Sequence, residues 1–164
     1  MSDKTISKDV IVVERTFDAP LALNWQLWTQ PELFKTWYGP KGFTVPVAEM
    51  DVRVGGKHLF CMQTADSNRK MWSTGEYTDI VLHQRLVFTD SLADEQGNVV
   101  SPSFYGMKGD YPITTEVTVL LEDLDGRTKM VMKHTGVPAS AIAGWEQAFT
   151  KMADYLETVR NDKS

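Results

Sequence analysis

The sequence predicts an α+β fold in which a curved antiparallel sheet of six to seven strands wraps around one long C-terminal helix. That helix is predicted over Ala139 to Arg160, where apolar residues recur every three or four positions and charged residues occupy the other faces. Strand-like segments follow one another through short turns, which favours antiparallel pairing because parallel neighbours need long crossovers. A helix of about 33 Å needs a broad apolar partner, and a curved sheet supplies one.

A strand and a helical hairpin are predicted at the start of the chain. The β-branched residues from Val10 to Phe17 are typical of a strand. Pro20 suits the first turn of a short helix that runs to Thr29. Pro31 begins a second short helix, which Gly39-Pro40 ends. After the first strand, this hairpin is the only connection long enough to carry the chain across the sheet.

Six further strands are expected between the hairpin and the C-terminal helix. Turn residues such as Gly55-Gly56 and Asp125-Gly126 separate them, and Asp-Gly is a strong hairpin signal. The expected strands are Phe43 to Asp51, Lys57 to Gln63, Met71 to Val81, Leu86 to Leu92, Thr114 to Glu122 and Thr128 to His134. We expect a single domain over residues 10–160, with residues 1–9 and 161–164 as flexible termini.

The segment Ala93 to Pro112 is predicted to be an ordered lid. A loop of about twenty residues is unusual inside a compact domain and usually marks a lid, a binding loop or disorder. The aromatic and apolar residues within it favour a lid, and the candidate contacts to a ligand are Phe104, Tyr105, Met107 and Tyr111.

Composition excludes several classes of function. A net charge of −5 with scattered basic residues argues against a nucleic-acid surface, which needs clustered Lys and Arg. Apolar runs are too short for a membrane span, and the polar start of the chain lacks a signal core, so we expect a cytoplasmic protein. The single Cys61 excludes an internal disulfide, and three histidines without grouped spacing predict no metal site. We expect no cofactor.

The alternation of side chains across each strand predicts which residues face the helix. If Phe17 points inward, Arg15 does too, and the same parity applies on each later strand unless a bulge reverses it. Most inward positions are apolar, which predicts a hydrophobic cavity between sheet and helix. The predicted wall consists of Arg15, His58, Phe60, Met62, Tyr77, Phe88, Val117, Val119, Met130, Met132, His134, Trp145, Phe149 and Met152.

Each of the few polar residues in this predicted wall has two possible roles. Arg15 cannot be deprotonated, so its guanidinium should pair with a carboxylate or remain in contact with water. The candidate carboxylates are those of Glu49, Asp51 and Glu76. That pair either orders the wall or leaves Arg15 to anchor a ligand carboxylate. His58 and His134 are either hydrogen-bonded wall residues or acid–base groups.

Several short motifs accompany the predicted order of one strand, two helices, six strands and one helix. They are Phe17-Asp18-Ala19-Pro20, Trp37-Tyr38-Gly39-Pro40, Asp51-Val52-Arg53-Val54-Gly55-Gly56, Arg85-Leu86-Val87-Phe88-Thr89 and Gly144-Trp145. As a set they resemble the START-like (SRPBCC) superfamily, in the branch named after the activator of the heat-shock-protein-90 ATPase, over about Val10 to Leu156. The resemblance implies a helix-grip fold, also called Bet v-like, whose cavity in many relatives holds a lipid, hormone or polyketide. It implies no shared catalytic set.

Three functions follow as hypotheses. The favoured one is non-catalytic binding of a small hydrophobic or amphipathic ligand by a monomer or homodimer. The second is a cavity enzyme of cyclase or hydratase type that uses Arg15, His58 or His134. The third is contact with a chaperone, as the resemblance implies. The activators after which the branch is named carry a separate N-terminal domain that also binds the chaperone, whereas nine residues, most of them polar, precede the first strand here.

Overall fold

The computed structural model describes residues 9–107 and 112–162 of the chain. The predicted termini at 1–8 and 163–164, and the lid residue Tyr111, lie outside the described residues. The elements in chain order are β1 (Val10–Phe17), α1 (Leu21–Thr29), α2 (Pro31–Phe34), β2 (Phe43–Met50), β3 (Lys57–Thr64), β4 (Lys70–Val81), β5 (Arg85–Ala93), the 3₁₀ helix η2 (Pro102–Tyr105), β6 (Thr114–Asp123), β7 (Thr128–Thr135) and α3 (Ala141–Asp162).

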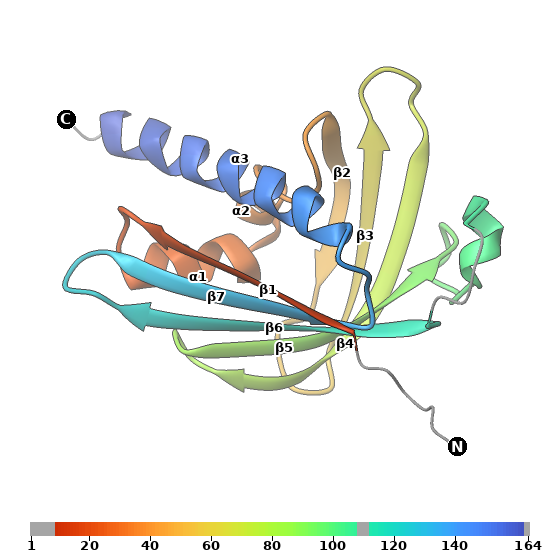
Figure 1. Ribbon diagram of the computed structural model, residues 1–164, viewed down its shortest axis with the longest axis horizontal. Coiled ribbons are helices and arrows are strands. Elements are labelled where there is room, and N and C mark those ends of the chain that lie inside the picture. The colour runs from red at the N-terminus through yellow and green to blue at the C-terminus, as the bar shows by residue number, and fades with distance from the viewer. Residues whose placement is uncertain (1–8, 108–111, 163–164) are drawn as a thin grey trace.

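The described strands form one antiparallel sheet with the order β1-β7-β6-β5-β4-β3-β2. β1 and β2 are therefore the two edges, and the helical hairpin α1–α2 carries the chain from one edge to the other. The sheet is strongly curved, and α3 lies across its concave side (Figure 1). The predicted α+β helix-grip fold is confirmed.

The long helix buries the stripe that its sequence predicts. Phe149 and Met152 are fully buried, and Trp145 packs against the core. The helix begins and ends two residues later than predicted, so it includes residues 161 and 162, which were predicted to belong to the terminus. Arg160 in its last turn pairs with Asp18 ahead of α1, which holds this end of the helix to the domain.

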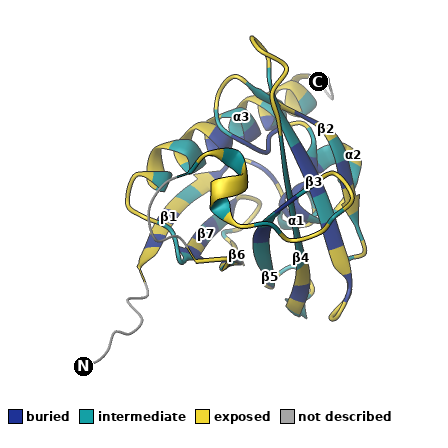
Figure 2. Ribbon diagram, turned by 90° about the vertical axis from the view of Figure 1, so that its right-hand side faces the viewer, coloured by how far each residue is buried: buried dark blue, intermediate teal, exposed yellow. Residues whose placement is uncertain are grey.

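Strands β1, β5, β6 and β7 bury every second residue over most of their length, as predicted from their apolar residues. On β5, Leu86 and Phe88 are buried, and on β6 Val117 and Val119 face the same interior. Buried positions lie along the inner faces of the strands and helices (Figure 2). The interior is rich in aromatic rings in close contact, such as the pair Trp28 and Trp37 with ring centroids 4.6 Å apart. Close aromatic pairs add stabilisation beyond burial alone.

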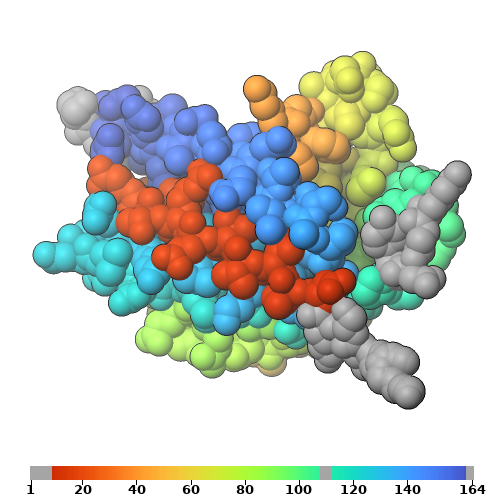
Figure 3. All heavy atoms as spheres, in the orientation of Figure 1, coloured from red at the N-terminus to blue at the C-terminus, as the bar shows by residue number. Residues whose placement is uncertain are grey.

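Arg15 joins the edge strand β1 to α3 rather than to a later strand. Its guanidinium donates to the Glu146 carboxylate at 2.8 Å and to the Thr150 hydroxyl at 3.1 Å. The predicted partners Glu49, Asp51 and Glu76 are therefore wrong, because α3 runs beside β1, as the space-filling view shows (Figure 3). The Arg15 side chain remains 28% exposed, so this pair is a surface clamp of modest energy.

The segment predicted as a lid contains local structure up to residue 107. Ala93 pairs with Val99, and η2 follows. The Tyr105 hydroxyl donates to the Ala93 carbonyl and accepts from the Trp72 amide at 3.0 Å, which fixes η2 to the end of the sheet. Phe104 is 60% exposed.

None of the helices in the described part of the chain has both the length and the apolarity required to cross a bilayer.

Candidate functional site

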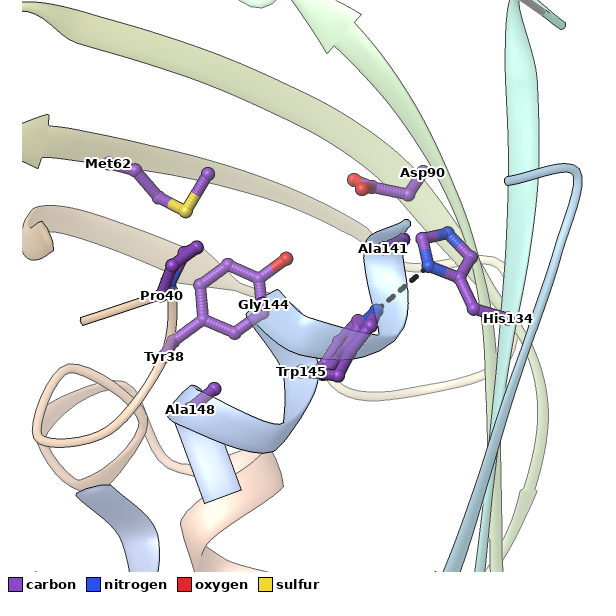
Figure 4. A pocket seen from close by; sticks show the side chains of 10 residues that line it. Tyr38, Pro40, Met62, Asp90, His134, Ala141, Gly144, Trp145 and Ala148 are labelled. Atoms are coloured by element: carbon purple, nitrogen blue, oxygen red, sulfur yellow. Dashed lines mark hydrogen bonds between the residues drawn. The ribbon is translucent and has the colours of Figure 1, made fainter. Parts of the chain in front are cut away.

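A pocket of about 260 Å³ lies between the first turns of α3 and the sheet, and we call it the helix pocket (Figure 4). Residues at positions 141, 144, 145 and 148 of α3 share one helix face, which forms one side of the pocket. The loop after α2 and the strands β3, β5 and β7 form the rest. Its lining is Tyr38, Gly39, Pro40, Met62, Asp90, His134, Ala141, Gly144, Trp145 and Ala148.

A second pocket of about 380 Å³, the loop pocket, adjoins it at the end of the sheet. The two pockets share Asp90, His134 and Ala141. The loop pocket is lined mainly by the ends of β4, β5 and β6, by the segment that includes Met107, by the connection between β7 and α3, and by Ala141 at the start of α3. Asp90 and His134 therefore stand where the two spaces meet.

The loop that carries Tyr38 is hydrogen-bonded to α3 through one half-buried ammonium group. Lys151 donates to the carbonyls of Tyr38, Pro40 and Phe43 at 3.3, 3.2 and 3.1 Å. Gly39 has a φ of +93°, and a Cβ there would lie 3.0 Å from the Met62 sulfur. A glycine is therefore needed for the chain to turn so close to β3.

His134 is held as a neutral ring by a chain of hydrogen bonds. The Trp145 indole N–H donates to its Nδ1 at 3.1 Å, so Nδ1 carries no proton. Its Nε2–H then donates to Thr115 Oγ1 at 2.9 Å, and that hydroxyl donates to the Asp90 carbonyl at 3.1 Å. Burial lowers the pKa of His134 to about 4. Both ring nitrogens are occupied, so the arrangement favours a wall residue over a base.

His58 is a second neutral histidine, deeper in the core. Its Nε2 is 2.9 Å from the Thr89 carbonyl, which can only accept, so this nitrogen carries the proton. Burial lowers the pKa of His58 to about 4, and the hydrogen bond to Thr89 opposes that shift. Its ring stacks on Phe60 with centroids 4.2 Å apart. These contacts also favour a structural role.

Asp90 is the acidic group of the helix pocket. The residue is half-buried overall, but its Oδ1 is enclosed and has no hydrogen-bond partner among the described residues. Burial raises the pKa of Asp90 to about 7, and a hydrogen bond with Ser73 opposes the rise. A carboxyl with a perturbed pKa at the wall of a pocket is a typical functional-site candidate.

Tyr38 faces Asp90 across the same space. Its hydroxyl and the Asp90 carboxyl both point into the pocket (Figure 4). Burial, and then the nearby Asp90 and Tyr77, raise the pKa of Tyr38 well above its ordinary value, so the phenol stays protonated. The Tyr38 and Trp145 rings are nearly perpendicular, with centroids 6.0 Å apart, and form an aromatic corner.

The structure places the predicted wall and lid residues in three kinds of position. Met62, His134 and Trp145 line the helix pocket, and the lid residue Met107 lines the loop pocket. Most of the others pack in the core beside the pockets, where their large side chains fill the space between α3 and the sheet. These are His58, Phe60, Tyr77, Phe88, Val117, Val119, Met130, Met132, Phe149 and Met152. Arg15 lies at the sheet edge, and Phe104 and Tyr105 line neither pocket.

Sequence reasoning missed both Asp90 and Tyr38, and only Asp90 had a signal that could have identified it. Asp90 shares the parity of Leu86 and Phe88, so continuing the alternation on β5 places a carboxyl inside. Tyr38 belongs to the Trp37-Tyr38-Gly39-Pro40 motif, where the turn at Gly39 gives no indication of which way the ring points.

The electrostatic character of the helix pocket is acidic. No Lys or Arg is among its described lining residues, and Asp90 is the group there that gains a charge near neutral pH. In residues 9–107 and 112–162, no three His, Cys, Asp or Glu side chains gather as metal ligands would.

Comparisons with solved structures show the same fold in bacterial proteins. A crystal structure from Chromobacterium violaceum has a TM-score of 0.72 at 22% identity and covers 90% of this chain and 96% of that chain. One from Nitrosomonas europaea has a TM-score of 0.74 at 20% identity, covering 93% and 96%. A solution structure from Arthrobacter aurescens is 28% identical with a TM-score of 0.62, covering 93% and 82%. A search of curated proteins finds no match.

A family model described as "Activator of Hsp90 ATPase homolog 1-like protein" matches residues 18–157, which include every element from α1 to β7 and most of α3. The chain belongs to the activator of Hsp90 ATPase homologue 1-like family within the START-like superfamily.

Proposed function

We propose that this protein binds a small hydrophobic or amphipathic molecule in the helix pocket. The observation that carries the proposal is a mostly apolar pocket into which two polar groups point, the Tyr38 hydroxyl and the Asp90 carboxyl, whose Oδ1 has no hydrogen-bond partner among the described residues. Ligand sites typically combine an apolar lining with a few such groups, which fix the ligand's orientation.

The size of the pocket sets the size of the ligand. Its 260 Å³ lies just below the roughly 300–1,000 Å³ typical of sites for drug-sized molecules, which suits a ligand with one or two rings. A longer ligand can extend past Asp90 and His134 into the loop pocket, because both residues border both spaces. The predicted lid, through Met107, would then cover its far end.

A binding screen with a matched pair of variants tests the proposal. Native mass spectrometry and thermal shift would be run against lipids, aromatics and polyketides. Ala141→Phe fills the point shared by both pockets, whereas Ala143→Phe places the same ring on the exposed side of α3. Binding that is lost in Ala141→Phe and kept in Ala143→Phe supports the pocket. Equal binding in both variants would place the ligand elsewhere.

A proton-transfer enzyme is a second candidate, and one observation favours it. A carboxyl with a pKa of about 7 can take or give a proton near neutral pH, and Asp90 meets this requirement where His58 and His134 do not. A ligand found in the screen would be incubated with the protein and with Asp90→Asn, and its mass and structure followed over time. A ligand recovered unchanged from the wild-type protein would end this candidate.

Contact with the Hsp90 chaperone is the rival role that the family description raises. Chaperone ATPase rates with and without this chain test it. Ala141→Phe serves as the control, because filling the pocket should leave a surface contact intact. Stimulation that this variant does not reduce would replace the ligand-binding proposal.

A further inference from the structure

We propose that the helix pocket selects small molecules that carry a protonated amine, and that the Asp90 carboxylate binds this group. The inference rests on the proposed function, since it names the chemical class of the ligand. It follows from three features of the pocket: an acceptor without a partner, an aromatic corner beside it, and a lack of cationic side chains among the described lining residues.

The unpartnered acceptor is Asp90 Oδ1. A buried carboxylate oxygen that makes no hydrogen bond is unfavourable, because it has lost water and gained nothing in exchange. Ser73 provides the one hydrogen bond that lowers the pKa of the carboxyl. A ligand ammonium group would supply both a donor for Oδ1 and the compensating charge. Hydrogen bonds between charged partners are the strongest that proteins form.

The titratable groups that face Asp90 are, within the described part of the chain, neutral near pH 7. Tyr38 approaches from the loop after α2, Tyr77 from β4 and His134 from β7. The pKa values of both tyrosines are raised, so both are neutral phenols near pH 7. His134 is neutral too, because burial lowers its pKa to about 4. Among the described residues that line the helix pocket, none supplies a positive charge to the ionised carboxylate, and a ligand ammonium group would supply it.

The aromatic corner favours the same chemistry. Cations bind the faces of tryptophan and tyrosine rings, and Trp145 and Tyr38 both line the pocket next to Asp90. A carboxylate ligand would instead meet Asp90 without any Lys or Arg among the described lining residues to pair with. The pocket thus discriminates against anions as well as for cations.

Three compounds of similar shape test the inference: 2-phenylethylamine as the cation, 2-phenylacetamide as the neutral analogue and phenylacetate as the anion. Their dissociation constants would be measured at pH 8 by NMR titration, using the Trp145 indole N–H signal as a reporter inside the pocket. We expect the amine to bind about tenfold or more tightly than either analogue, as a hydrogen bond to a charged group implies.

Two further measurements connect the preference to Asp90. Asp90→Asn should remove the advantage of the amine, whereas Asp154→Asn, which removes the same charge from the exposed face of α3, should preserve it. In the wild-type protein, lowering the pH from 8 to 5.5 protonates Asp90, so affinity for the amine should fall about tenfold or more while affinity for the acetamide stays constant. This second measurement requires no variant to fold.

The outcomes separate this inference from the proposed function. If the acetamide or phenylacetate binds as tightly as the amine, or if Asp90→Asn keeps the preference, the inference is overturned and the pocket remains a ligand site. The same holds if the screen yields Ala141-dependent ligands and none of them is an amine. If no compound in the series or the screen binds, both proposals fail.

Discussion

Replacing Asp90 with asparagine should stabilise the protein, and the gain should grow with pH. Below about pH 4 the carboxyl is protonated in both the folded and the unfolded chain, so it has no pH-dependent effect. Between pH 4 and 7 the folded state keeps the proton and the unfolded state releases it, because burial raises the pKa from 3.8 to about 7. Rising pH therefore favours unfolding through this residue, up to about pH 7.

The size of the effect follows from the two pKa values. The interval between 3.8 and about 7 corresponds to roughly 4 kcal/mol of stability lost by the wild-type protein above pH 7. Asparagine carries no such charge, although its buried amide also lacks a full set of partners. The free-energy difference between variant and wild type should thus rise from pH 4 to 7 and then level off.

Urea unfolding followed by tryptophan fluorescence at pH 4.5, 6 and 8 measures this difference. His58 and His134 give the opposite slope, since their lowered pKa values add stability as pH rises from about 4 to 6.5. Both proteins contain these histidines, so their contribution cancels. Asp154→Asn controls for the change in net charge. A difference that is constant across pH would refute the raised pKa of Asp90, and with it the view that the carboxyl is poised for a ligand.

Three further results are expected. Lys151→Met should lower the free energy of unfolding by about 2 kcal/mol, because three backbone carbonyls lose a charged donor, whereas the exposed Lys133→Met should change it little in the same urea assay. Gly75→Ala should destabilise the protein by about 3 kcal/mol or more, because the new Cβ would lie 1.8 Å from the Thr89 carbonyl oxygen on β5. Gly144→Ala in α3 should instead stabilise it by up to about 1 kcal/mol. Thermal unfolding measures both variants, and a Gly75→Ala protein more stable than Gly144→Ala would contradict this packing. Nitrogen-detected NMR should show the His134 ring in its neutral form at pH 5.5, with the proton on Nε2. A cationic ring at that pH would refute the chain of hydrogen bonds from Trp145 through His134 to Thr115.

The fold could be read from the sequence because its signals are local. Alternation fixed the inward face of each strand, and the spacing of Trp145, Phe149 and Met152 fixed the buried face of the helix. Turn residues such as Asp125-Gly126, both with positive φ in the structure, placed the hairpins. Both ends of the helix lie two residues beyond their predicted positions, and its last turn makes a long-range pair between Arg160 and Asp18 that no local signal reports.

The partner of Arg15 shows where local reasoning fails. Parity indicates the face of β1 on which Arg15 lies, but not the angle at which α3 crosses that strand. This angle brings Glu146 and Thr150 to the guanidinium and leaves Glu49 on another part of the sheet. An ion pair between residues so far apart in the chain depends on how the helix is seated.

By itself the sequence determined the order of the elements, the curved antiparallel sheet, the buried stripe of α3 and the family. Only the tertiary structure decided which inward residues fill the interior and which border open space, because that depends on how closely the side chains of α3 and the sheet interlock. It also brought Asp90, Tyr38 and Trp145, from three separate segments, to one pocket. Strand alternation predicts the face of the sheet on which a side chain lies, whereas predicting a site also requires the residues that face it from other elements.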